Sequence, residues 1–109
     1  MLIKEIITSL GHNCKEADNG KKAIDIINEE VPHIIFMDIE MPVMNGFETT
    51  HYIRDELLLG KDKLPVIALT AHDPALFEEE FKENPFNDVA TKPYNPLIFE
   101  DLINKHFSL

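Results

Sequence analysis

Three polar residues of different chemistry, Asp38, Thr70 and Lys92, each follow a short and mostly apolar run of the chain. Such runs are typical of buried strands in a parallel sheet. An aspartate carboxylate can act as a nucleophile toward phosphorus, and phosphoryl transfer depends on positive charge and hydrogen-bond donors around the phosphoryl oxygens. The lysine supplies a positive charge and the threonine supplies an O–H donor. Together these residue types predict a site for phosphoryl transfer.

Each of the three residues also has an ordinary structural interpretation. Asp38 could be a turn residue at a strand end, Thr70 could cap the next helix, and Lys92 could be a surface lysine. The joint pattern favours function, because a carboxylate directly after Phe36 and Met37 would be costly to bury without a partner. The histidines show no spacing typical of metal ligands, and we expect all five at the surface: His12, His33, His51, His72 and His106.

Hydrophobic periodicity predicts helices that alternate with strands along the chain. Helices are expected over residues 2–10, 20–30, 46–59, 73–84 and 95–107. Strands are expected over residues 34–38, 64–70 and 89–92, with a weaker candidate over residues 13–17. The alternation predicts an α/β fold with a parallel sheet, helices on both faces and the three polar residues at one edge.

Single residues predict where several of these elements end and what they bury. Gly11 is expected to end the first helix, and the turn at residues 18–20 is expected to cap the second. Gly60 is expected to end the helix of residues 46–59. The strands of residues 34–38 and 64–70 are expected to be buried on both faces. On the helix of residues 46–59 we expect four buried side chains: Phe47, Tyr52, Ile53 and Leu57.

Length and charge limit the classes of function. A chain of 109 residues is the size of one domain, and a net charge of −10 argues against a nucleic-acid-binding surface, which would need a basic patch. A single cysteine, Cys14, allows no internal disulfide and fits a reducing compartment. No apolar run approaches the length of a membrane span, and the first residues do not resemble a signal peptide. We therefore expect a cytoplasmic protein.

The order and spacing of these residues resemble the receiver domain of bacterial two-component response regulators, especially receivers fused to hybrid histidine kinases. The resemblance rests on DIEMPVMNG at residues 38–46, on Thr70-Ala71 after VIAL, and on Lys92-Pro93. It covers essentially all 109 residues. It implies a flavodoxin-like (CheY-like) fold and a single receiver-like domain over residues 1–109.

The resemblance also implies a role for each residue. Asp38 would accept a phosphoryl group from a histidine kinase or a phosphotransfer protein. Thr70 would bind a phosphoryl oxygen, and Lys92 would pair with the phosphoryl group. Mg²⁺ would be held by Asp38 and by the backbone carbonyl of Glu40. Such a domain is not a dedicated enzyme, although it assists its own phosphorylation and dephosphorylation.

The sequence departs from the family pattern in two places. The family begins with a strand that ends in paired acidic residues, which hold the Mg²⁺, and those positions would fall before Met1. We therefore expect an N-terminally truncated receiver with an incomplete metal site, weak Mg²⁺ binding and impaired phosphorylation. The absent strand would leave residues 34–38 at an open edge, repaired by the neighbouring strand or by strand exchange in a homodimer. The switch aromatic, expected three residues before Lys92, is Val89, and Phe86 has the wrong offset.

Two other functions remain open from the sequence. The first is a pseudo-receiver, which would bind a partner through the same surface without phosphorylation. The second is a phosphatase of the HAD type, which also uses a strand-end aspartate, a threonine or serine, and a lysine. The phosphatase function is disfavoured, because the downstream aspartate pair that would hold its metal has no counterpart after Lys92.

Overall fold

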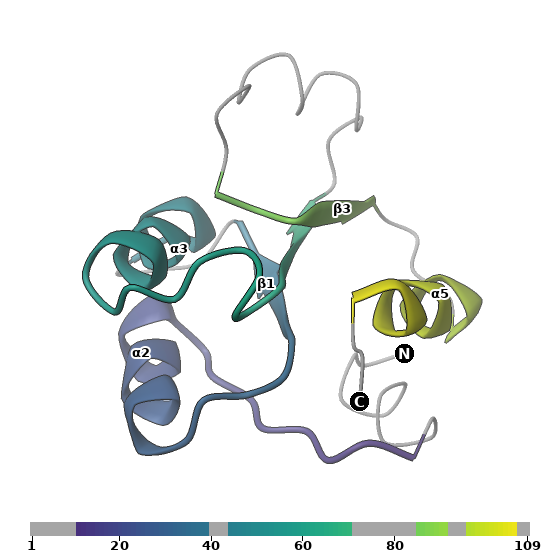
Figure 1. Cartoon of the computed structure of the whole chain (residues 1–109), viewed down its shortest axis with the longest axis horizontal. Coiled ribbons are helices and arrows are strands. Elements are labelled where there is room, and N and C mark those ends of the chain that lie inside the picture. Colours follow the sequence, from purple (N-terminus) through teal and green to yellow (C-terminus); the bar gives the residue numbers. More distant parts are fainter. Residues whose placement is uncertain (1–10, 40–43, 71–84, 92–95, 107–109) are drawn as a thin grey trace.

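The computed structural model describes residues 11–39, 44–70, 85–91 and 96–106. In chain order the described elements are α2 (Gly20–Glu29), β1 (Ile35–Asp38), α3 (Gly46–Asp55), β2 (Val66–Thr70), β3 (Asp88–Thr91) and α5 (Pro96–His106) (Figure 1). The helices predicted over residues 2–10 and 73–84 lie outside the described residues. The remaining predicted helices and the three main strands are confirmed within a few residues.

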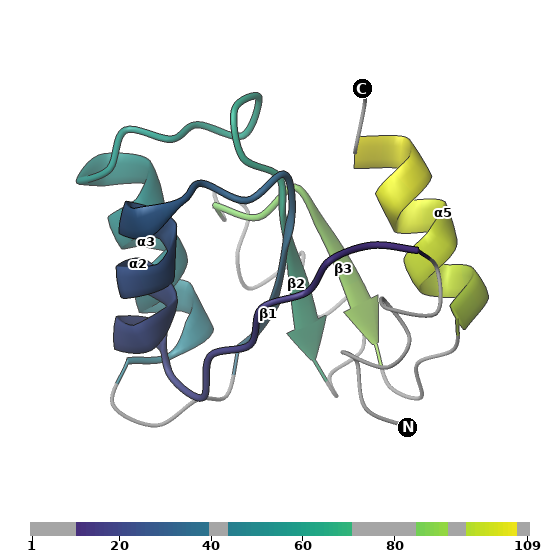
Figure 2. The ribbon, with the colours of Figure 1, turned by 90° about the horizontal axis from the view of Figure 1, so that it is seen from below.

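The strands form a parallel sheet in the order β1-β2-β3. The central strand, β2, is buried at every position, because it has a strand on either side and helices on both faces. Helices α2 and α3 cover one face of the sheet, and α5 covers the other (Figure 2). The α/β architecture predicted from the sequence is therefore confirmed.

Each face of the sheet has its own hydrophobic cluster. On the side of α2 and α3 the buried members are Ile27, Met37, Ile53, Leu64, Val66, Ala68 and Phe86. On the side of α5, Leu69, Ala90 and Phe99 form a smaller cluster. Phe36 packs edge-on against Phe99 with ring centroids 4.9 Å apart. The alternation of β2 side chains between the two clusters, Ala68 to one and Leu69 to the other, is the period-two pattern of a strand covered on both sides.

Two strand predictions are wrong. Residues 13–17 form no strand, which fits a segment containing Asn13, Lys15 and Glu16, residue types that pack poorly in sheets. Strand β1 is not buried on both faces, since only Met37 of its four residues is fully buried. The cause is its position, because β1 is an edge strand of the sheet that the described residues form.

The end and one buried position of α3 also differ from prediction. The helix ends at Asp55 and not at Gly60. Leu58 takes the left-handed conformation, with φ 56°, and the Leu59 N–H donates to the Ile53 carbonyl at 3.1 Å, which closes the end of the helix. Tyr52 is 37% exposed and is not a core residue. Within the described residues, no helix is both long enough and apolar enough to cross a membrane.

Candidate functional site

The carboxyl ends of β1 and β2 bring two of the three predicted site residues to one edge of the sheet. Asp38 is the last residue of β1 and is exposed. It stands opposite Leu69, and the Ile39 N–H donates to the Leu69 carbonyl at 3.2 Å. Thr70, one position beyond Leu69, is the last residue of β2 and is only 5% exposed. The edge therefore carries an accessible carboxylate beside a buried hydroxyl.

The third predicted residue, Lys92, lies outside the described residues, as does Glu40. Thr91, which directly precedes Lys92, is the last residue of β3 and stands opposite Thr70. The carboxyl end of β3 therefore lies at the same edge as those of β1 and β2. How the Lys92 side chain lies relative to Asp38 stays a prediction.

The start of α3 packs directly against the backbone of Asp38. The Gly46 N–H donates to the Ile39 carbonyl at 3.0 Å, which closes the loop that follows β1. A Cβ atom at Gly46 would collide with the Asp38 carbonyl oxygen and would lie 2.9 Å from the Ile39 Cα. Only glycine allows this approach, so Gly46 fixes the strand end that carries the carboxylate.

The start of α2 packs against α3 in the same way. A Cβ at Gly20 would collide with the Thr49 hydroxyl and would lie 2.8 Å from the Met44 carbonyl oxygen. Each helix is capped by the asparagine before its glycine: the Lys22 N–H donates to the Asn19 side chain, and Glu48 and Asn45 form a reciprocal capping box.

Sequence reasoning used Gly46 only as a motif residue and as the start of a helix. The signal that could have revealed its packing role is the repeated Asn-Gly pair at residues 19–20 and 45–46, one directly before each helix.

A half-buried arginine organises the opposite edge of the sheet, and sequence reasoning missed it. Arg54, near the end of α3, donates to the carbonyls of Leu59 at 2.9 Å, Leu64 at 2.7 Å and Pro85 at 3.0 Å. Burial lowers the pKa of its guanidinium, and the negative charge of Asp62 opposes this shift. The arginine therefore ties the loop before β2 to the segment before β3.

An acidic residue at the start of β3 holds the end of α5. The Asp88 Oδ2 atom accepts from Lys105 Nζ at 3.0 Å and lies 3.1 Å from His106 Nε2. Its Oδ1 atom accepts from the Val89 N–H at 2.9 Å. Burial raises the pKa of Asp88, but these hydrogen bonds outweigh burial and leave the pKa below its ordinary value. The prediction that all histidines lie at the surface is wrong for His106, whose side chain is 15% exposed.

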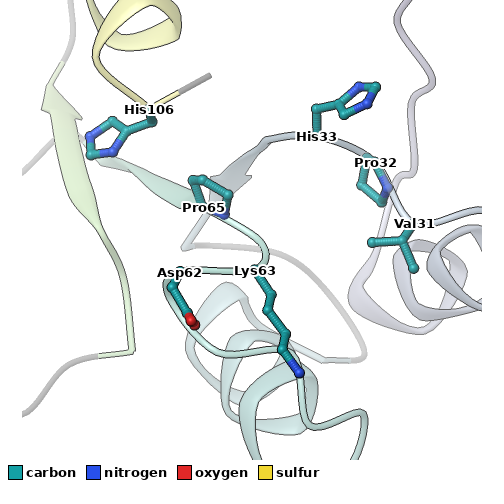
Figure 3. A pocket seen from close by; sticks show the side chains of 7 residues that line it. All are labelled: Val31, Pro32, His33, Asp62, Lys63, Pro65 and His106. Atoms are coloured by element: carbon teal, nitrogen blue, oxygen red, sulfur yellow. The ribbon is translucent and has the colours of Figure 1, made fainter. Parts of the chain in front are cut away.

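A cavity of about 350 Å³ is lined in part by His106, which contacts Asp88, and Asp38 is not among its lining residues (Figure 3). Its walls come from the segments before β1 and β2 and from the end of α5, so it lies at the amino ends of the strands. Ligands of open α/β sheets bind at the carboxyl ends. The cavity is therefore separate from the candidate phosphoryl site. Its lining residues are Val31, Pro32, His33, Asp62, Lys63, Pro65 and His106.

The described residues offer an incomplete set of ligands for a magnesium ion. Mg²⁺ is usually held by one or two carboxylates together with waters and phosphate oxygens. Asp38 supplies one accessible carboxylate at the strand edge. Among the described residues, no group of three or more His, Cys, Asp or Glu side chains could hold a metal ion. Among the described residues, Asp38 is thus the one carboxylate at this strand edge that could contribute to a magnesium site.

Sequence comparison identifies the family. Residues 1–104 match the response regulator receiver domain. The chain therefore belongs to the receiver family of two-component signalling, whose members are phosphoacceptor signalling modules and not dedicated enzymes.

Individual relatives agree with this assignment. Hybrid signal transduction histidine kinase C of Dictyostelium discoideum is 39% identical over 95% of this chain, which spans only 9% of that kinase. Chemotaxis protein CheY4 of Vibrio cholerae shares the fold, with a TM-score of 0.83 and 23% identity over 95% of this chain and 85% of that one. The receiver of sensor histidine kinase PA1611 from Pseudomonas aeruginosa, solved with a magnesium ion in its active site cleft, matches with a TM-score of 0.81 and 24% identity over 96% of this chain and 84% of that one. The CheY-like fold is therefore established.

Proposed function

We propose that Asp38 is the phosphoacceptor and that a histidine kinase or a phosphotransfer protein is the donor. The observation that carries this proposal is the accessible Asp38 carboxylate at the end of β1, one register position from Thr70, in a chain of the receiver family. A carboxylate oxygen forms a bond to phosphorus while the bond from phosphorus to the donor histidine breaks. The electron pair of that bond returns to the imidazole. Thr70 donates a hydrogen bond to a phosphoryl oxygen, and Lys92 pairs with the phosphoryl charge.

The metal is proposed to be Mg²⁺, with Asp38 and the backbone carbonyl of Glu40 as ligands. When bound, the ion would neutralise charge on the phosphoryl oxygens. In the part of the chain that the structure describes, no adjacent acidic pair stands at a strand end. A polypeptide of these residues alone is therefore proposed to bind Mg²⁺ weakly and to be phosphorylated poorly.

Residues 1–109 are proposed to act as one receiver domain, and the chain spans only 9% and 6% of two hybrid kinases that it resembles. Its acidic charge supports a protein partner and not a nucleic acid or a membrane. The cytoplasm is the proposed compartment, in keeping with a single cysteine.

A homodimer formed by strand exchange is a second proposal, since no described strand pairs with the outer side of β1. Light scattering on the 109-residue chain tests it, and a compact monomer would rule it out.

Labelling with acetyl phosphate tests the phosphoacceptor proposal. The 109-residue chain with Mg²⁺ should label weakly, and a polypeptide extended at its amino end by a designed strand that ends in an acidic pair should label strongly. Asp38→Asn in the extended polypeptide should abolish the label, and Asp25→Asn, an exposed carboxylate of α2, is the matched control. Strong labelling of the short chain would refute the impairment, whereas an unlabelled extended polypeptide would refute phosphoacceptor function.

The pseudo-receiver is the alternative function, favoured by the lack of an acidic pair at the end of any described strand. For Asp38→Asn, the pseudo-receiver predicts no change, whereas the phosphoacceptor proposal predicts a loss. Partner binding that is unchanged by Asp38→Asn and by acetyl phosphate would support a module that works without phosphorylation.

A further inference from the structure

Two adjacent residues, Asn87 and Asp88, connect the start of β3 to helices on opposite faces of the sheet. Asn87 binds Arg54 of α3 on one face, and Asp88 binds Lys105 and His106 of α5 on the other. Successive side chains point to opposite faces of a strand, so neighbouring residues suit this double connection. We call this pair the β3 junction.

Asn87 uses both its backbone and its side chain to fix β3 against β2. Its N–H donates to the Val66 carbonyl at 2.8 Å, and its Oδ1 atom accepts from the Val66 N–H at 3.0 Å. The same Oδ1 atom accepts from Arg54 Nη2 at 2.9 Å, and Nδ2 donates to the Lys61 carbonyl at 2.9 Å. A slip of one residue would break all four bonds together, so Asn87 defines the register.

The register that begins here ends at the candidate phosphoryl site. Ile67 stands opposite Asp88 at the start of β3, and Thr70 stands opposite Thr91 at its end. Lys92 is the next residue in the sequence. Whatever holds the start of β3 in register therefore also sets where the chain reaches the Thr70 edge.

Asp88 adds a connection to the other layer. Its carboxylate is shared between Lys105, His106 and the Val89 N–H, and its side chain is 24% exposed. Lys105 and His106 lie in the last turn of α5, where cations are favoured by the helix dipole. The ion pair therefore fastens the end of α5 to the same point of β3 that Asn87 fastens to α3.

We propose that Arg54, Asn87 and Asp88 are positioning residues for the phosphoryl site, which act by holding β3 in register from the edge opposite Asp38. The functional meaning of this inference rests on the proposed phosphoacceptor function. The structural part is that the β3 junction controls order at the Thr70–Thr91 end, and this part is independent of the phosphoacceptor function.

Amide hydrogen exchange on the 109-residue chain tests the structural part, because it compares local opening with global unfolding. In Asn87→Ala, exchange of the amides at residues 69–70 and 90–91 should rise about tenfold more than the loss of global stability explains. A tenfold rise corresponds to about 1.4 kcal/mol in the free energy of local opening. Asn87→Asp keeps the oxygen that Arg54 and Val66 use, so it should restore most of the protection.

Ile53→Val is the matched control. Ile53 precedes Arg54 on α3, and its side chain is apolar and fully buried, so removal of one methylene should lower global stability without a selective effect on the Thr70–Thr91 end. Should Asn87→Ala not fold, Arg54→Lys gives the same comparison, since lysine keeps the charge but loses the forked donors.

Two results would overturn the inference. Exchange at residues 69–70 and 90–91 could rise only in proportion to global unfolding, as in the control. It could also rise only at residues 66, 87 and 88, beside the substitution. Exchange needs no phosphoryl donor, so a selective rise together with an unlabelled extended polypeptide would refute the phosphoacceptor function and keep the junction. Strong labelling of the extended polypeptide without a selective rise in exchange would refute the role of the junction and keep the phosphoacceptor function.

Discussion

Replacing Gly46 by alanine is the most direct test of how the candidate site is built. Gly46 is the first residue of α3, and its N–H donates to the Ile39 carbonyl at 3.0 Å. The added Cβ would collide with the backbone carbonyl oxygen of Asp38 and would approach the Ile39 Cα to 2.9 Å. Both obstacles are backbone atoms, so no side-chain rotation can relieve the contact.

Two opposing terms set the size of the effect. Forcing extra atoms into a packed site costs about 1–3 kcal/mol, and a rigid backbone obstacle should give the upper half of that range. Alanine also lowers the conformational entropy of the unfolded chain, which stabilises the folded state by about 0.4–1 kcal/mol. Gly46→Ala should therefore lower the free energy of unfolding by about 1.5–2 kcal/mol, which corresponds to a fall in Tm of roughly 10 °C for a domain of this size.

Urea denaturation followed by circular dichroism measures this change. The matched control is Gly60→Ala, because the Cβ there would meet only the Asp62 side-chain oxygen, at 3.0 Å, which can rotate away. That variant should be within about 0.5 kcal/mol of the parent. Equal stability of Gly46→Ala and the parent would refute the close approach of α3 to the Asp38 backbone. It would also remove the argument that Gly46 fixes the strand end.

Two further substitutions test other features of the fold. Asp88 has a pKa lowered from its ordinary value of 3.8, so its ion pairs stabilise the folded state above that pH and are lost as the pH falls through the folded pKa. Asp88→Asn should therefore cost roughly 1 kcal/mol at pH 7, and the difference from the parent should shrink as the pH falls below 3.8 and through the lower folded pKa; a difference that does not shrink on this acidification would contradict the argument. Leu58→Gly should raise the free energy of unfolding by about 0.5–1 kcal/mol in urea melts. Leu58 is 72% exposed and has φ 56°, a conformation that glycine adopts without strain. A loss of stability would contradict this and show that the leucine side chain makes stabilising contacts.

The architecture could be predicted from the sequence because it depends on periodicity. Apolar runs separated by amphipathic segments lead to parallel strands with helices on both faces, and β2 and α5 were found within two residues of their predicted ends. Burial of β1 could not be predicted, since the run of residues 34–37 looks the same in a central and in an edge strand. Whether a strand has a neighbouring strand along both of its edges depends on the rest of the sheet and not on its own residues.

The contacts around the site were harder to predict because they join residues far apart in the sequence. Arg54 and Asn87 are 33 residues apart, and neither stands out in a charged helix or a polar turn. The Asp88–His106 contact spans 18 residues. By contrast, Asp38 and Thr70 could be assigned to one edge because the topological rule for parallel sheets requires it.

The candidate site is supported by contacts that begin well away from its three polar residues. Gly20 lets α2 pack on the start of α3, and Gly46 lets α3 pack on the backbone of Asp38. From the other end of the sheet, Asn87 sets the register that finishes at Thr70 and Thr91. A chain that kept Asp38, Thr70 and Lys92 but lost these contacts would carry the right chemical groups without holding them at one edge. The competence of a receiver-like sequence for phosphorylation should therefore follow its Gly46 and Asn87 equivalents as well as its acidic and basic residues.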